Sequence, residues 1–113
     1  MIWYLLAVPL AGVGAALRVW VTQATERRVP GGAPTSTAAI NVAGAAAIGL
    51  LAGAGETTAL VVGAGLLGGF TTFSTWMVEV DAAHRAGRVR TAVLTLVLPL
   101  AIGVAACAAT SAL

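Results

Sequence analysis

The stretch Gly68-Gly69-Phe70-Thr71-Thr72-Phe73-Ser74-Thr75-Trp76 decides the fold, because it interrupts a chain that is otherwise strongly apolar. It combines two adjacent glycines, four hydroxyl residues and three aromatic residues. Glycine is a poor helix former, and the β-branched Thr71 and Thr72 lose rotamer freedom in a helix. At membrane depth such a break is tolerated only where it is buried in protein or lines a wet cavity. The stretch therefore predicts either a functional site or a kinked helix whose hydroxyls bond to its own backbone.

The composition predicts an integral membrane protein. Of the 113 residues, 59% are hydrophobic and 9% are charged, whereas soluble proteins carry about 25% charged residues. The charges stand in short islands between apolar runs, and a bilayer span needs about 20 apolar residues. The N-terminus has no basic region, so we do not expect a signal peptide. Residues 1–113 should form one transmembrane domain.

Several functional classes have no support in the sequence. The single Cys107 excludes a disulfide within the chain, and His84 has no second ligand at metal-binding spacing. The arginines form no basic stripe, which argues against nucleic-acid binding. No catalytic constellation is present, so we do not expect an enzyme.

The apolar runs predict an all-α protein with four transmembrane helices, over about residues 2–22, 36–54, 58–83 and 91–113. The third helix should be broken near Gly68–Thr71. Small residues spaced by four, Gly49 with Gly53 and Gly65 with Gly69, predict close contact between helices. The helices should be joined by a polar loop at 25–37, a turn at 55–58 and a basic loop at 81–90.

The loop charges predict an orientation in the membrane. Four spans put the first and third loops on one side, and the other side carries no Lys or Arg. By the positive-inside rule both termini should then face outward. The arginines of the two loops are Arg27, Arg28, Arg85, Arg88 and Arg90.

Two polar residues within the spans each leave two interpretations open. Arg18 either extends to the lipid headgroups or draws anions into a vestibule. Asn41 either bonds a neighbouring helix as structural glue or donates to an anion in a polar pathway. If the helix resumes after the glycines, Phe70, Phe73 and Trp76 share one face. They then serve packing, or they offer positively polarised ring edges to an anion.

The same residues resemble the signature of a known family. The run Gly68–Thr75, followed by an aromatic residue and Glu79, is similar to the signature of the CrcB/Fluc fluoride channels. Gly14-Ala-Ala-Leu-Arg18 resembles the arginine motif in that family's first span, and Asn41-Val-Ala-Gly44 resembles the asparagine motif in its second. The resemblance covers essentially the whole chain.

This resemblance implies a fluoride-selective channel in the cell (plasma) membrane that exports fluoride passively and relieves its toxicity. It implies an antiparallel dimer with two fluoride pathways. A structural sodium ion at the dimer centre would be held by the backbone carbonyls of Gly68 and Thr71. The family's pathway residues correspond here to Arg18, Asn41, Phe73, Ser74, Thr75, Trp76 and Glu79.

Two departures and two rival functions qualify this expectation. Trp76 stands where the family usually has Phe, which adds bulk and an indole N–H donor. The one-sided arginines argue against insertion in both orientations, so we hypothesise a heterodimer with an oppositely oriented homologous chain rather than a homodimer. One rival function is a small multidrug-resistance-like exporter, which relies on an acidic residue in its first span, and this chain has none there. The other is a non-conducting partner subunit.

Overall fold

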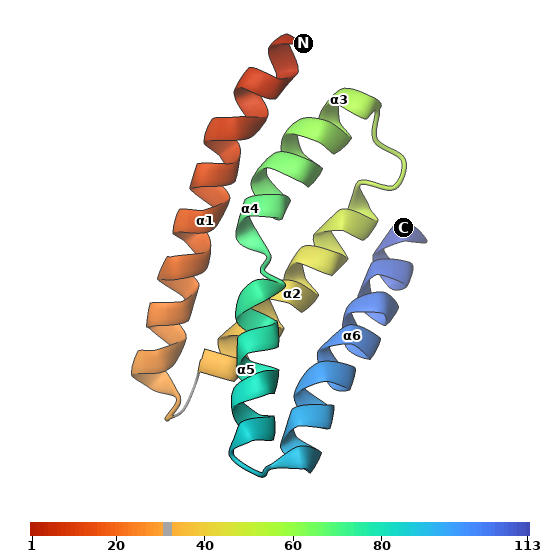
Figure 1. Ribbon diagram of the computed structural model, residues 1–113. Coiled ribbons are helices and arrows are strands. Elements are labelled where there is room, and N and C mark those ends of the chain that lie inside the picture. The colour runs from red at the N-terminus through yellow and green to blue at the C-terminus, as the bar shows by residue number, and fades with distance from the viewer. Residues whose placement is uncertain (31–32) are drawn as a thin grey trace.

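The computed structural model describes residues 1–30 and 33–113, and its regular structure there is entirely helical, as predicted (Figure 1). Gly31 and Gly32, which belong to the predicted loop 25–37, lie outside the described residues. The elements are α1 (Ile2–Arg28), α2 (Ala33–Leu50), α3 (Glu56–Thr58), η1 (Ala59–Leu67), α4 (Gly68–Phe70), α5 (Ser74–Arg85) and α6 (Val89–Ser111).

Three helical segments are long and apolar enough to cross a membrane by length and composition: Ile2–Arg28, Glu56–Arg85 and Val89–Ser111. The second of these joins α3, η1, α4 and α5 across the break. The chain is therefore a helical membrane protein. Helix α2 is 18 residues long and begins with polar residues, and its rise of ~27 Å falls just short of the ~30 Å hydrocarbon core. Its role as a fourth span stays a prediction.

The helix boundaries differ from the predicted ones at two places. Helix α1 continues to Arg28 instead of ending near residue 22, because the segment after Thr22 contains good helix formers and two arginines that suit a helix C-terminus. Helix α2 ends at Leu50, so Gly53 lies in a turn instead of in the second span. The predicted turn at residues 55–58 is correspondingly earlier, since α3 already begins at Glu56.

Glycines bring the first half of the third helix against the backbone of α1. A Cβ atom added at Gly65 would lie 2.9 Å from the Ala7 carbonyl, and one at Gly69 would overlap the Ala11 carbonyl. In the opposite direction, a Cβ at Gly14 of α1 would overlap the Leu66 carbonyl. The predicted close contact through Gly65 and Gly69 is confirmed, and it lies within one chain.

Of the other predicted pair, Gly49 and Gly53, only Gly49 makes a close helix contact. A Cβ at Gly49 would overlap the Thr110 side chain and the Cys107 carbonyl of α6, whereas one at Gly53 would meet nothing within 4 Å. The Thr110 hydroxyl also donates to the Ala46 carbonyl at 2.6 Å. Helices α2 and α6 are therefore closely packed around Gly49.

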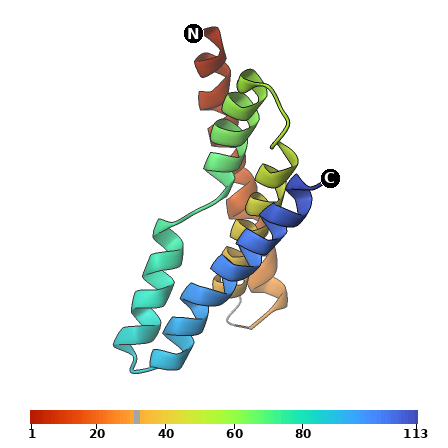
Figure 2. The same ribbon diagram turned by 90° about the vertical axis from the view of Figure 1, so that its right-hand side faces the viewer.

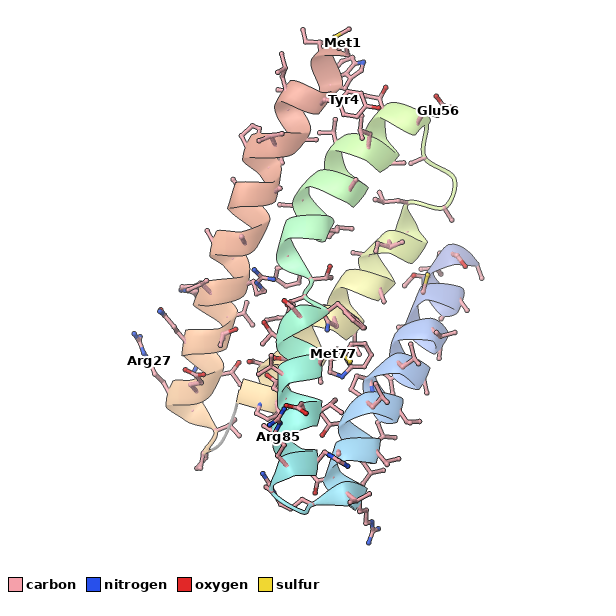
Figure 3. All side chains as sticks on the ribbon, in the orientation of Figure 1. Met1, Tyr4, Arg27, Glu56, Met77 and Arg85 are labelled. Atoms are coloured by element: carbon pink, nitrogen blue, oxygen red, sulfur yellow. The ribbon has the colours of Figure 1, made fainter. Side chains whose placement is uncertain are left out.

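The two halves of the third helix, before and after the break, pack against different helices. Segments η1 and α4 lie along α1, whereas α5 lies along α6. In Figure 2 the extended segment after α4 leads from the side of α1 to the side of α6, and α5 with the start of α6 is displaced from α1. Figure 3 shows Arg27 and Arg85 toward one end of the molecule, and Met1 and Glu56 at the other. The two arginine-bearing loops thus share one end.

Candidate functional site

The helix break occupies residues 71–73, at the end of the predicted stretch near Gly68–Thr71. Gly68 and Gly69 are still helical, and the chain turns extended at Thr71, where ψ is 160°. The amide and the hydroxyl of Thr71 both donate to the Leu67 carbonyl, each at 2.9 Å. Within the described part of the chain, the Gly68 carbonyl has no backbone donor, because the Thr72 amide that would reach it points elsewhere.

Asn41 holds the break open through two reciprocal hydrogen bonds. Its Nδ2 donates to the Thr72 carbonyl at 2.7 Å, and its Oδ1 accepts from the Thr72 amide at 2.8 Å. The side-chain amide thereby replaces the helical partners that Thr72 loses at the break. This is the structural-glue interpretation of Asn41. One of the two Nδ2 hydrogens is not used by these bonds, so an anion-donor role is compatible with it.

Thr72 also bonds to the first turn of the next helix, α5, which begins at Ser74. Its buried hydroxyl accepts a hydrogen bond from the Thr75 amide at 3.3 Å and donates to the Thr75 hydroxyl at 3.1 Å. A threonine oxygen bonded to an amide three residues later satisfies one of the free N–H groups of a helix start. Thr72 therefore organises both sides of the break: its backbone is held by Asn41, and its side chain caps α5.

A polar cavity of about 460 Å³ lies beside the break, between α1, α2 and α5. Arg18 reaches into this region and donates from Nη1 to the Thr71 carbonyl at 3.1 Å. The Arg18 side chain thus bonds to the backbone at the break, and its role toward anions stays a prediction. The cavity is lined by Arg18, Val19, Thr22, Gln23, Glu26, Thr37, Ile40, Thr72, Thr75 and Glu79.

Glu79 and Thr37 form the polar pair in the wall of this cavity. The buried Thr37 hydroxyl donates to Glu79 Oε1 at 2.6 Å. The second carboxylate oxygen, Oε2, is buried, and no described group bonds to it. A buried carboxylate oxygen without a partner is costly, and such groups are concentrated at functional sites.

The aromatic residues separate into two groups instead of sharing one face. The rings of Phe73 and Trp76 meet edge to face, with centroids 6.0 Å apart and an interplanar angle of 87°. Phe70 precedes the break and lies near Gly44 of α2, where its ring would contact an added Cβ. The expectation of three aligned rings was wrong for Phe70, because the helix resumes only at Ser74.

Two hollows meet at Thr72. The polar cavity lies on one side, and a second hollow of about 210 Å³ is lined by Asn41, Phe73 and Trp76 among others. Thr72 belongs to the wall of both. Of the remaining predicted pathway residues, Thr75 lines the polar cavity, and Ser74 is exposed at the start of α5. Apart from Ser74, the predicted pathway residues line one or other of these two hollows.

Three of the residues that build the site were not predicted from the sequence: Thr72, Thr37 and Thr95, whose carbonyl accepts from Trp76. Thr37 precedes Asn41 by four residues, and this spacing puts both on one helix face. The sequence could therefore have indicated that Thr37 lies on the same side of α2 as Asn41. The pairing of Thr72 with Asn41 depends on where the extended segment leaves the helix, which the residue pattern does not specify.

Comparison with known proteins identifies related sequences. The family described as "CrcB-like protein, Camphor Resistance (CrcB)" matches residues 5–111. A fluoride-specific ion channel FluC 2 of Mycobacterium bovis is 35% identical over 99 residues, covering 86% of this chain and 79% of that protein. A fluoride-specific ion channel FluC of Hyphomonas neptunium is 39% identical over 110 residues, covering 89% and 87%. A FluC 1 of the same description from Symbiobacterium thermophilum is 38% identical over 115 residues, covering 94% and 91%.

The family match spans nearly the whole chain and includes the arginine motif, the asparagine motif and the broken third helix. The relatives align over most of their own length as well. The chain therefore belongs to the CrcB/Fluc family.

Proposed function

We propose that this chain is a subunit of a fluoride channel that lets fluoride leave the cell passively and so relieves its toxicity. The observation that carries the proposal is the break at residues 71–73, held by Asn41 beside a polar cavity inside an apolar protein. The relatives named above are fluoride-specific ion channels, which supports the same function. Transport of this kind is not enzymatic. Its driving force includes the membrane potential, worth ~2.3 kcal/mol per charge per 100 mV.

The pathway we propose begins at the polar cavity and passes the break. Arg18 attracts anions into the cavity, and Thr75 offers a hydroxyl to them. Beyond Thr72, Asn41, Phe73 and Trp76 line the second hollow, and Asn41 Nδ2 has one hydrogen that its bond to Thr72 does not use. Ring edges carry partial positive charge and can replace water around a small anion. Ser74 and Glu79 complete the proposed pathway.

The channel requires a second subunit. Phe73 is 69% exposed in the single chain, although it lies beside the break. An antiparallel dimer, with α2 as the fourth span of each chain, would cover this ring. Five arginines gather in the two loops at one end, which favours one orientation with both termini outside. We therefore favour a heterodimer with an oppositely oriented homologous chain over a homodimer.

The Gly68 carbonyl makes the break compatible with a structural sodium ion at the dimer centre. It is a hard oxygen donor without a backbone partner among the described residues, as such a cation requires. The Thr71 carbonyl already accepts from Arg18, so it would be the weaker of the two ligands. One chain would supply these two carbonyls, and the second subunit would supply the others. When bound, the ion would be coordinated by carbonyl oxygens of both subunits and would join them. Replacing sodium by choline should then lower the thermal stability of the dimer.

Fluoride efflux from liposomes tests the proposed function directly. We expect a fluoride flux when this chain is reconstituted with its partner, and a much smaller flux for Phe73→Ile and for Asn41→Asp. A proton-coupled exporter of the small multidrug-resistance type would transport organic cations and no fluoride. A non-conducting subunit would add nothing to the flux of its partner. An unchanged flux in both variants would contradict the pathway.

A topology assay tests the assembly. Tags at the N-terminus and in the loop at 86–88 should report one orientation, with the terminus outside. Equal populations in both orientations would reject the heterodimer and leave the homodimer. Reconstitution of the chain alone provides the complementary measurement, since a homodimer conducts without a partner.

A further inference from the structure

Helix α6 contains a backbone carbonyl that its own helix cannot satisfy. Proline has no N–H, so a proline within a helix leaves the carbonyl four residues earlier without its partner. Pro99 lies inside α6, and the residue four positions earlier is Thr95. In a membrane no water compensates for such a loss, and each unsatisfied group is expensive.

The indole of Trp76 occupies this carbonyl. Its Nε1 donates to the Thr95 carbonyl at 2.6 Å, which joins α5 to α6. Trp76 and Pro99 also line one cavity of about 240 Å³, together with Asn41. The residue that replaces the family's usual Phe thus contributes an N–H donor at the place where α6 lacks one.

We propose that Trp76 and Pro99 are a matched pair. Pro99 withholds the amide that would bind the Thr95 carbonyl, and the Trp76 indole takes its place. This makes Trp76 a positioning residue, because the bond fixes its ring against α6 while the ring packs in a T-shaped pair with Phe73. The indole N–H is committed to the Thr95 carbonyl, so only the ring is offered to an anion. This last consequence rests on the proposed function, whereas the pairing itself does not.

Indole N–H signals of the ¹⁵N-labelled protein test the bond. The chain has three tryptophans, so three signals are expected. The signal that disappears in Trp76→Phe belongs to the Trp76 indole. Its N–H proton should exchange with solvent at least about tenfold more slowly than that of the exposed Trp20 indole. Trp20→Phe identifies that reference signal. Equal exchange rates for the two indoles would overturn the bond.

A double-mutant cycle tests the pairing. Trp76→Phe keeps an aromatic ring and leaves the Thr95 carbonyl unsatisfied, so it should lower the folding equilibrium constant about tenfold. In the Pro99→Ala background the backbone amide of Ala satisfies that carbonyl, and the same change should cost less than about threefold. Lost packing is common to both backgrounds and cancels. Equal costs in the two backgrounds would overturn the pairing.

Pro9→Ala provides the matched control background. Pro9 is also a proline within a helix, and no described side chain bonds to the Leu5 carbonyl four residues before it. Trp76→Phe should therefore still cost about tenfold in that background. A reduced cost there as well would mean that removing any proline relieves the change, which would overturn a specific pair.

Fluoride flux separates this inference from the proposed function. If Trp76 acts through α6, the double variant should lose no more flux than the more impaired single variant. If the fold-loss of flux in the double variant equals the product of the two single fold-losses, the positioning role is overturned. If the unmodified protein carries no fluoride, the proposed function fails, and the stability cycle still decides the pairing.

Discussion

Before the break, the third helix contacts α1 backbone to backbone, and after the break it contacts α6 through large and polar side chains. Gly65 and Gly69 bring the first half onto Ala7 and Ala11 of α1. In the second half, Trp76 bonds to α6 and Glu79 faces the polar cavity. Close glycine contacts give van der Waals packing but leave no room for polar groups. The first half therefore packs as a scaffold, and the second half carries polar and aromatic groups of the proposed pathway.

Gly69→Ala should be the most damaging change, because the scaffold has no space for one methyl group. The added Cβ would overlap the Ala11 backbone, which cannot move aside as a flexible side chain would. We expect a loss of about 3 kcal/mol in the free energy of unfolding, measured by denaturant titration in detergent.

Gly63→Ala is the matched control within the same segment. Its Cβ would lie 3.6 Å from Leu51 Cδ1, which is an ordinary contact. It should cost less than about 1 kcal/mol. A similar cost for both alanines would show that general helix disturbance, instead of contact with α1, limits the first half.

Asn41→Ala should have the next largest effect, because it removes the side chain that joins the two halves at the break. Both Asn41 bonds go to the backbone of Thr72, which is buried and would lose a donor and an acceptor at once. We expect a loss of about 2 kcal/mol in the same titration. Ser74→Ala, at an exposed position, serves as the control and should change stability by less than about 0.5 kcal/mol.

Asn41→Asp tests the direction of these bonds. The carboxylate can still accept from the Thr72 amide, but it cannot donate to the Thr72 carbonyl. Its second oxygen would instead lie against the Thr72 carbonyl oxygen, and because a partly buried charge facing an acceptor is costly, Asn41→Asp should be at least as destabilising as Asn41→Ala. A stability equal to that of the unmodified protein would mean that the carbonyl bond contributes nothing to the break.

Thr37→Val should have an intermediate effect, confined to the second half. The change keeps the side-chain shape and removes the hydroxyl that donates to Glu79 Oε1, so the carboxylate loses its hydrogen bond from α2. We expect a loss of about 1.5 kcal/mol in the free energy of unfolding. If Glu79→Gln abolishes this cost, the hydroxyl acts through the carboxylate; if it does not, Thr37 stabilises α2 in another way.

The sequence predicted the helical class and the position of the break because both follow from composition and local propensity. Long apolar runs require helices in a bilayer, and a polar, glycine-containing interruption cannot be exposed to lipid. The role of the glycines was less predictable. Gly68 and Gly69 are helical, and Gly69 serves contact with α1 instead of loosening the chain. A glycine that packs and a glycine that bends look the same in a sequence.

The sequence predicted which residues gather around the break but not the hydrogen bonds that they make there. Asn41, Phe73 and Glu79 were identified by type and by resemblance, and all lie around the break. Their partners are backbone groups or single hydroxyls on other helices, as with Thr72 and Thr37. Such partners depend on the rotation of one helix against another, which periodicity alone does not fix. Trp76 illustrates this. From the sequence its indole N–H is a free donor, whereas in the structure it donates to the Thr95 carbonyl of α6.

Arg18→Lys should have a smaller effect, at the boundary between the halves. Arg18 belongs to α1, yet it bonds to the Thr71 carbonyl where the first half ends. Lysine keeps the charge but lacks the planar fork of donors, so we expect a loss of about 1 kcal/mol in a partly exposed contact. Arg27→Lys, at an exposed position, is the control. If fluoride entry falls only in Arg18→Gln and mainly at low salt, the charge rather than the bond draws anions.

Gly12→Ala should have the smallest effect, and whether it raises or lowers the free energy of unfolding shows what covers this face of α1. Gly12 lies in α1 near the scaffold, but a Cβ there would meet nothing within 4 Å. Alanine favours a helix over glycine, so the single chain should gain about 0.5 kcal/mol in the free energy of unfolding. The same titration on the assembled channel provides the comparison. A gain in both states means that this face of α1 meets lipid, whereas a loss on assembly means that the second subunit packs against Gly12 as closely as Gly65 and Gly69 pack against α1.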